Sequence, residues 1–290
     1  MLAPLTSVLL FLAAIIVAFW YLQVEEIDRE QEAVKRDVEY AQQRVRLRLL
    51  ERQEQLMRLA RDVSNKEVDP EEFMARSESL EAQYPELLDI TWINARRRII
   101  ASQSAPSVPS AQQRVAGDIL KIGETENSYS LTRELQQPVY AQPLARPDRV
   151  ALLQLHVPLA DGGKFGGVVL GEYSLDGLLR YGVPAEVSAR YSVALLDGKG
   201  NLLAGNTVPT RTPGASLLPW TAPPNEYEVP VSPVGNGLII LAQAYRTSMG
   251  VIGSGLFWLV CALSMLTAWM LIATWRHTRR RVQVQQALVS

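Results

Sequence analysis

Arginine and aromatic side chains are the residues in this sequence best suited to bind a small molecule. Three arginines stand together after an apolar run that contains a tryptophan, and another precedes a run with a tyrosine. A guanidinium pairs with a carboxylate through two parallel hydrogen bonds, and a phenol adds one directed hydrogen bond. This chemistry suits a small anion such as an organic acid. The candidate ligand-binding residues are Arg96, Arg98, Arg133, Trp92, Tyr129, Tyr140, His156 and Tyr173.

Each candidate also has a structural interpretation. Successive side chains of a strand point to opposite faces, so at most two of the three consecutive arginines Arg96 to Arg98 can face one site. An arginine on a solvated face, and an aromatic ring packed in the core, explain the same residue types. His156 alternates with Gln154 in an apolar strand, where a structural histidine is the simpler interpretation.

Residue patterns typical of catalysis are missing from the sequence. It has no Gly-x-Ser-x-Gly turn, no His-Glu-x-x-His helix and no cluster of cysteine with histidine. The two histidines are His156 and His277, and the single cysteine, Cys261, lies in an apolar segment. We therefore expect no catalytic residue, no bound metal and no cofactor. A formal net charge of −1 gives no reason to expect a nucleic-acid partner.

Two apolar segments, one near each end, predict a protein that crosses a membrane twice. They run from about Leu5 to Leu22 and from about Val251 to Trp275, and each is long enough to span a hydrocarbon core. Arginines follow the second segment, at Arg276 and at Arg279 to Arg281, whereas acidic residues follow the first. The positive-inside rule then places the C-terminus in the cytoplasm and the intervening residues outside it. The scarcity of cysteine favours a bacterial inner membrane with a periplasmic domain.

A long amphipathic helix is predicted directly after the first apolar segment. From Gln23 to Ser64 the sequence has no proline or glycine. Apolar residues recur there at mostly three- and four-residue steps, which is the helical period. The apolar positions are Ile27, Val34, Val38, Ala41, Val45, Leu49, Leu56, Leu59 and Val63. Such a helix can pack on its own domain, on the same helix of a second subunit, or on both.

Shorter elements follow this helix in an order that predicts two sheets. Asp69 and Pro70 are suited to begin a second helix, as N-cap and first helical residue. Strands are then predicted in two groups, and a helix is expected between the first two and the rest, at about Ala111 to Gly123. Asp161 to Lys164 and Asp197 to Gly200 have the composition of hairpin turns. The predicted strands are Leu87–Ile93, Arg98–Ala101, Val139–Leu144, Val150–Leu159, Phe165–Leu175, Tyr191–Leu196, Asn201–Ala204, Tyr227–Val231 and Gly237–Ala244.

The order of these features resembles the extracytoplasmic region of bacterial receptors with tandem PAS-like sensor domains of the double Cache type, with CHASE-type domains as a close alternative. The residues that carry the resemblance are Tyr84-Pro85 before the strand with Trp92, the block Pro138 to Leu144, the two Asp-Gly hairpins and the second apolar segment. The resemblance implies an α+β fold, with two transmembrane helices flanking a long N-terminal helix and two antiparallel-sheet domains. It also implies a homodimer that senses a small molecule.

Domain boundaries follow from the same comparison. The expected parts are a transmembrane helix (1–22), a long helix (23–63), a membrane-distal sensor domain (64–183), a membrane-proximal domain (184–248), a second transmembrane helix (249–275) and a cytoplasmic linker (276–290). The resemblance favours the input region of a sensor histidine kinase, with a chemoreceptor or diguanylate cyclase as alternatives. A membrane-anchored scaffold that binds a periplasmic protein is the competing hypothesis.

Overall fold

The computed structural model describes most of the chain between its two ends. Within helix α1 the side chains of residues 3–12, 19, 23, 26 and 27 are not described. The predicted end of the strand at Leu144, the proline-rich segment 208–224 and the arginines at 279–281 lie outside the described part. The described residues are 3–120, 123, 126–143, 150–207, 226–231, 237–245, 258–270 and 272–276.

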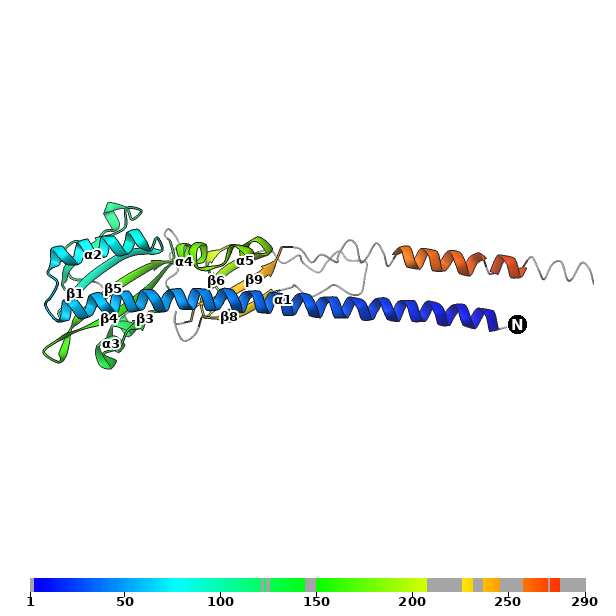
Figure 1. Cartoon of the computed structure of the whole chain (residues 1–290), viewed down its shortest axis with the longest axis horizontal. Helices are drawn as coiled ribbons and strands as arrows, with labels where there is room; N and C mark the ends of the chain where they lie inside the picture. The colour runs from blue at the N-terminus through cyan, green and yellow to red at the C-terminus, as the bar shows by residue number, and fades with distance from the viewer. Residues whose placement is uncertain are drawn as a thin grey trace, which may run out of the picture. The chain divides into compact units, whose positions relative to one another are not determined.

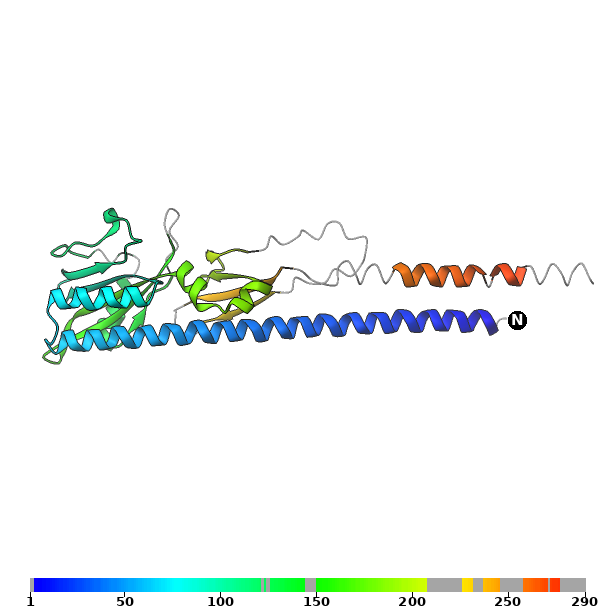
Figure 2. The same cartoon turned by 45° about the horizontal axis from the view of Figure 1, so that its top comes forward.

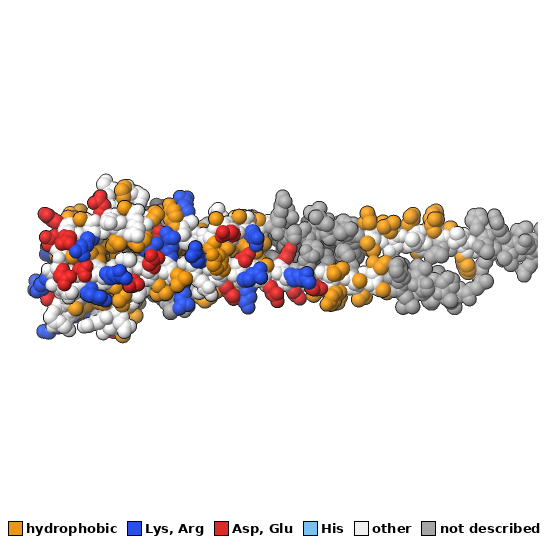
Figure 3. Space-filling model, in the orientation of Figure 1, with side chains coloured by type: hydrophobic (Ala, Val, Ile, Leu, Met, Phe, Trp, Pro, Cys, Tyr) orange, Lys and Arg blue, Asp and Glu red, His pale blue; other side chains and the backbone are white. Residues whose placement is uncertain are grey.

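Two units make up the structure. One comprises Ala33–Tyr245 and contains both sheets, and the other comprises Met1–Glu32 and Arg246–Ser290. In the second unit, Trp258–Arg276 has the length and apolar composition to cross a membrane, and its visible surface is largely hydrophobic (Figure 3). The N-terminal part of α1 contains a shorter apolar stretch, Ala13–Leu22. Among the described residues the structure thus contains one candidate membrane helix, where the sequence predicted two.

The unit Ala33–Tyr245 has an α+β fold with two antiparallel sheets, as the family resemblance implied. The first sheet has the strand order β2-β1-β5-β4-β3 and the second has the order β7-β6-β9-β8. The strands of the first sheet are β1 (Leu87–Asn94), β2 (Ile99–Ser104), β3 (Val139–Tyr140), β4 (Leu152–Asp161) and β5 (Lys164–Ser174). Those of the second are β6 (Tyr191–Leu196), β7 (Leu202–Gly205), β8 (Glu226–Pro230) and β9 (Ile239–Ala244).

Helix α1 (Ala3–Ser64) runs past both sheets of this unit (Figures 1 and 2). Its buried residues fall on one stripe, as the spacing predicted, and they pack in one core cluster with residues of both sheets. Arg52 is the one charged residue of the stripe. The buried α1 residues are Val34, Val38, Ala41, Val45, Leu49, Arg52, Leu56, Leu59, Ala60 and Val63.

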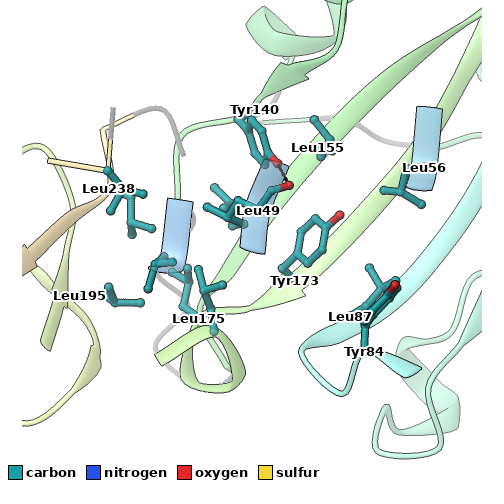
Figure 4. Close-up of a cluster of buried hydrophobic side chains, with 14 of the residues drawn as sticks. Leu49, Leu56, Tyr84, Leu87, Tyr140, Leu155, Tyr173, Leu175, Leu195 and Leu238 are labelled. Carbon is teal, nitrogen blue, oxygen red and sulfur yellow. Dashed lines mark hydrogen bonds between the residues drawn. The ribbon is translucent and has the colours of Figure 1, made fainter. Parts of the chain in front are cut away.

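Close contacts fix α1 on the first sheet (Figure 4). The hydroxyl of Tyr140 donates a hydrogen bond to the carbonyl of Leu49 over 3.1 Å. A Cβ atom on Gly171 would lie 2.5 Å from the Leu56 side chain, so the absence of a side chain there lets the helix approach β5. Arg48 and Arg52 both donate to the fully buried carboxylate of Glu86, at 2.7 and 3.2 Å. Burial opposes ionisation of Glu86, but these arginines hold its pKa below the ordinary value.

The shorter helices lie around the sheets. Helix α2 (Pro70–Gln83) begins as predicted, because the Asp69 carboxylate accepts hydrogen bonds from the backbone of Glu71 and Glu72. The 3-10 helix η1 (Ser110–Gln112) and helix α3 (Glu126–Leu135) lie between β2 and β3. Helices α4 (Leu175–Gly182) and α5 (Ala185–Arg190) connect the two sheets.

The helix predicted at about Ala111 to Gly123 is wrong. Among residues 111–120 only the end of η1 is helical, and the chain then turns at Gly117, with φ +95°, to form a bridge between Ile119 and Arg98. Backbone hydrogen bonds to Ile99 and Arg97 hold this extended path, so pairing with the start of β2 prevails over helix formation. The helix of this connection is α3, which the residue pattern did not reveal.

By contrast, the predicted hairpin at Asp161–Lys164 is confirmed. It joins β4 to β5, with positive φ at Gly162 and Gly163.

Removal of a large side chain from the α1 stripe should destabilise the protein strongly. Leu49→Ala deletes a side chain that is 0% exposed, so the free energy of unfolding should fall by about 2–5 kcal/mol. Leu202→Ala, at a side chain that is 48% exposed on β7, should change it by less than about 1 kcal/mol. Urea denaturation of the full chain in detergent measures both. Equal losses would contradict the assignment of the stripe.

Candidate functional site

The two faces of the first sheet differ in chemistry because side chains alternate along its strands. The helix face packs against α1 and α2 and carries Leu153, Leu155 and Val157 of β4 with Val169 and Tyr173 of β5. The alternate residues point to the opposite side, which we call the outer face. Polar residues gather there. Asp89, Thr91, Gln154, His156 and Glu172 are buried, and Ser102 and Ser104 are half-buried.

An ion-paired cluster occupies the centre of the outer face. Asp89 of β1 and Glu172 of β5 are paired in register across the two strands, which brings two carboxylates together. Arg114, from the connection after η1, donates to Asp89 Oδ1 over 2.6 Å and to Glu172 Oε1 over 2.7 Å. We call these three residues the acidic cluster, since two carboxylates face one guanidinium.

Neutral polar groups complete the surroundings of the acidic cluster. Ser104 donates to Asp89 Oδ2 over 2.6 Å, and the Thr91 hydroxyl donates to Oδ1 of the same carboxylate. Gln154 donates through its side-chain amide to Glu172. These bonds fix both carboxylates from three strands of the sheet, and so the position of the charge depends on sheet register rather than on a loop.

Burial governs the ionisation of these groups. It raises the pKa of Asp89, and the charge of Arg114 opposes that shift. Burial would lower the pKa of Arg114, but Glu172 and Asp89 together raise it above its ordinary value. Burial lowers the pKa of His156 to about 4, although nearby Glu172 favours the charged form. At neutral pH His156 is therefore an uncharged imidazole that offers one donor and one acceptor.

Gln154 and His156 of the outer face, and Tyr129, which packs on His156, are buried side chains with polar atoms. The Arg97 guanidinium lies 5.0 Å from the centroid of the Tyr129 ring. Among the described residues, no hydrogen-bond partner meets the standard geometry at Gln154 Oε1, the Tyr129 hydroxyl or either ring nitrogen of His156. Tyr129, from α3, packs edge-on against His156 and Phe165, with ring centroids 6.2 and 5.9 Å apart. A buried polar atom without a partner costs free energy, so these atoms are suited to meet a polar ligand.

The structure brings together two of the eight residues that the sequence indicated. Tyr129 and His156 lie on the outer face. Trp92, Tyr140 and Tyr173 point to the helix face, where Trp92 packs 5.7 Å from the Phe73 ring. Arg96, Arg98 and Arg133 are exposed, and Arg98 donates to the carbonyl of Gly117 over 3.0 Å.

Sequence reasoning missed the three charged residues of the acidic cluster. Asp89 and Glu172 each interrupt an apolar strand, and a charged residue between buried neighbours is a recognisable signal. Nothing in the sequence around Arg114 marks it, because its neighbours Gln113, Val115 and Ala116 form no pattern that predicts a buried position.

Comparisons with known proteins find similarity in structure. No protein family matches the chain, and no curated protein sequence does. The ligand-binding domain of the amino acid chemoreceptor PctC of Pseudomonas aeruginosa PAO1, solved with GABA, has a TM-score of 0.47 at 14% identity, over 74% of this chain and 99% of that one. The extracellular domain of the histidine kinase named mmHK1S-Z2 has a TM-score of 0.49 at 13% identity, over 73% of this chain and 95% of that one.

A further similar structure is the ligand-binding domain of the Campylobacter jejuni chemoreceptor Tlp3 with L-valine. Its TM-score is 0.44 at 14% identity, over 64% of this chain and 73% of that one. These structures are sensor domains of the kind that the order of elements resembles, and each has a TM-score below 0.5.

Glu81, on α2, provides a test of the electrostatics around Asp89. It is buried, and neither carboxylate oxygen has a hydrogen-bond partner of good geometry among the described residues. Burial, and then the charge of Asp89, raise its pKa to about 7 from 4.5. The folded state therefore holds this proton more tightly than the unfolded state, and stability is lost as the pH rises from about 4.5 to about 7.

Glu81→Gln should imitate the protonated carboxyl. At pH 8 the variant should be more stable than the unmodified chain by up to about 3 kcal/mol, and at pH 4.5 the difference should be close to zero. Urea denaturation at the two pH values measures this difference. The same difference at both pH values would show that Glu81 is not buried in its charged form.

Proposed function

We propose that this chain is the input region of a membrane receptor and that a small molecule binds at the outer face of the first sheet. The observation that supports this most directly is the acidic cluster. Charged groups are expensive to bury, and replacing a buried ion pair with apolar residues is often neutral or stabilising. A group of three on one face of a sheet is therefore better explained by recognition than by stability.

The balance of charge at the outer face favours a ligand with a cationic group. Asp89 and Glu172 together carry two negative charges when ionised, and Arg114 compensates one of them. The net negative charge of the acidic cluster attracts a cation and repels an anion. The organic acid expected from the sequence depended on Arg96, Arg98 and Arg133, which are exposed.

The connections of the acidic cluster provide a path to the second sheet. Glu172 stands two residues before Ser174, which caps α4 by accepting a hydrogen bond from the backbone of Gly177. Arg48 of α1 donates to the carbonyl of Tyr181 in α4 over 2.8 Å, and also to Glu86. A shift of β5 on ligand binding would therefore move α4 and the second sheet relative to α1.

Membrane placement follows the pattern of apolar and basic residues. We propose two membrane spans, one in the N-terminal part of α1 and one that includes Trp258–Arg276. The arginines from Arg276 onward favour a cytoplasmic C-terminus, with both sheets in the periplasm of a bacterial inner membrane. The output would be that of a histidine kinase, with a chemoreceptor or a diguanylate cyclase as alternatives.

We also propose that the receptor is a homodimer in which the α1 helices of the two copies pack against each other. Tyr40, Leu47 and Leu50 are exposed apolar side chains on this helix, with Leu47 62% exposed. Their spacings of seven and three residues follow the heptad pattern of two helices that pack side by side. This stripe differs from the stripe that packs on the sheets, so one helix can serve both contacts.

The ligand prediction separates a cationic from an anionic ligand. Thermal shift of the full chain in detergent, screened against primary amines, amino acids and organic acids, should give a dose-dependent rise in Tm. Glu172→Gln should abolish the response to a cationic ligand, while Arg133→Ala should preserve it. The reverse result would favour the anionic ligand, and a flat screen on folded protein would favour a protein partner.

The dimer prediction uses disulfide formation. Leu47→Cys should give an intermolecular disulfide on mild oxidation of the receptor in membranes, because a two-fold axis along α1 brings the two copies of this position together. Glu71→Cys, at an exposed position on α2, serves as the control and should remain monomeric on a non-reducing gel. Equal cross-linking of both variants would argue against an α1 interface.

A further inference from the structure

The segment that covers the acidic cluster has an unusual pattern of burial. Every residue from 110 to 119 is exposed except Arg114. We call Ser110–Leu120 the covering segment. Val115 and Ile119 are 62% and 63% exposed, so the segment has no apolar anchor at these positions. Arg114 therefore holds the middle of the segment to the sheet, while Arg98 donates a hydrogen bond to the carbonyl of Gly117 nearer its end, over 3.0 Å.

Backbone contacts hold the far end of the covering segment. The carbonyl of Asp118 accepts a hydrogen bond from Ile99 over 2.9 Å, and Gly117 donates to Ile99 over 2.8 Å. Leu120 donates to the carbonyl of Arg97 over 2.8 Å. These bonds lie beyond Arg114 in the chain. The segment can thus move at its middle while its end stays attached to the start of β2.

The guanidinium of Arg114 occupies the position that offers the most to a cation. It contacts one oxygen of Asp89 and one of Glu172, and its side chain is 18% exposed. A second cation cannot take the same place. It can, however, replace the first, because the exchange of one cation for another leaves the buried charge unchanged and avoids two unpaired carboxylates.

We propose that Arg114 is an internal competitor of the ligand, so that a cationic ligand displaces its guanidinium and releases the covering segment. This inference rests on the proposed function, since it assigns a regulatory role to the same site. In the unliganded receptor Arg114 pairs with both carboxylates and keeps the segment closed. The ligand then pairs with the two carboxylates in place of Arg114. The released covering segment distinguishes the ligand-bound state from the unliganded one.

Hydrogen exchange on the full chain in detergent tests this competition, with methylguanidinium as a probe that imitates the arginine side chain. In Arg114→Ala the amides of residues 110–116 should exchange at least about 10-fold faster than in the unmodified chain. Methylguanidinium should raise the Tm of Arg114→Ala in a dose-dependent way. At the same concentrations it should have little effect on the unmodified chain, whose own arginine fills the site.

Matched variants test whether the effects on exchange and on Tm are specific to Arg114 and its carboxylate partners. Arg96→Ala removes an exposed arginine from the neighbouring turn and should leave both exchange and the response to methylguanidinium unchanged. The double variant Arg114→Ala with Glu172→Gln should lose the response. If Arg114→Ala does not fold, Arg114→Lys serves instead, because it keeps the charge but not the two-pronged contact, and it should show a smaller increase in exchange.

Two results would overturn the proposal. One is unchanged exchange of residues 110–116 in the Arg114 variants. The other is an equal response to methylguanidinium with and without Arg114. Neither depends on the ligand screen, so a screen without hits together with rescue by methylguanidinium would reject the proposed ligand and retain the competition. A ligand found in the screen, together with no effect of methylguanidinium on the Tm of Arg114→Ala, would retain the proposed ligand and reject the competition.

Discussion

The packing of one stripe of α1 against both sheets is the interaction on which the rest of this structure depends. The stripe includes Val38 and Leu49, both fully buried, and it joins residues of the two sheets in one core cluster. Since one rigid helix contacts both sheets, the helix faces of both must be apolar. The outer face of the first sheet does not pack against α1, so its residues need not be apolar. Charged residues can therefore gather there without disturbing the core.

The two buried ionic groups of the first sheet have different surroundings, and this difference gives them different roles. Glu86 is fully buried and is held by two arginines of α1, itself part of the rigid core. The acidic cluster, in contrast, receives its cation from a segment that is otherwise exposed. Both groups pair opposite charges, but only the second can exchange its cation without disrupting the core. The stable pairing therefore lies in the turn before β1, against α1, and the exchangeable pairing lies on the outer face of the sheet.

Prediction from the sequence succeeded where a local pattern determined the structure. The period of apolar residues gave the stripe of α1, Asp69 and Pro70 gave the start of α2, and paired glycines gave the hairpin after Asp161. It failed between β2 and β3, because pairing of Ile119 with Arg98 is a contact between distant residues that no local propensity encodes. The aromatic candidates illustrate the same limit. Tyr140 and Tyr129 are both tyrosines near the first sheet, yet they lie on opposite faces of it.

The sequence by itself determined the apolar segments, the long helix, the α+β class and the order of the strands along the chain. Each of these depends on residue types at short spacing. Only the tertiary structure decided which polar residues meet. Asp89 and Glu172 come together through the register of β1 on β5, and Arg114 reaches them from a separate segment. Strand register and the path of a covering segment are set by packing across the whole domain, so the site could not be read from any part of the sequence alone.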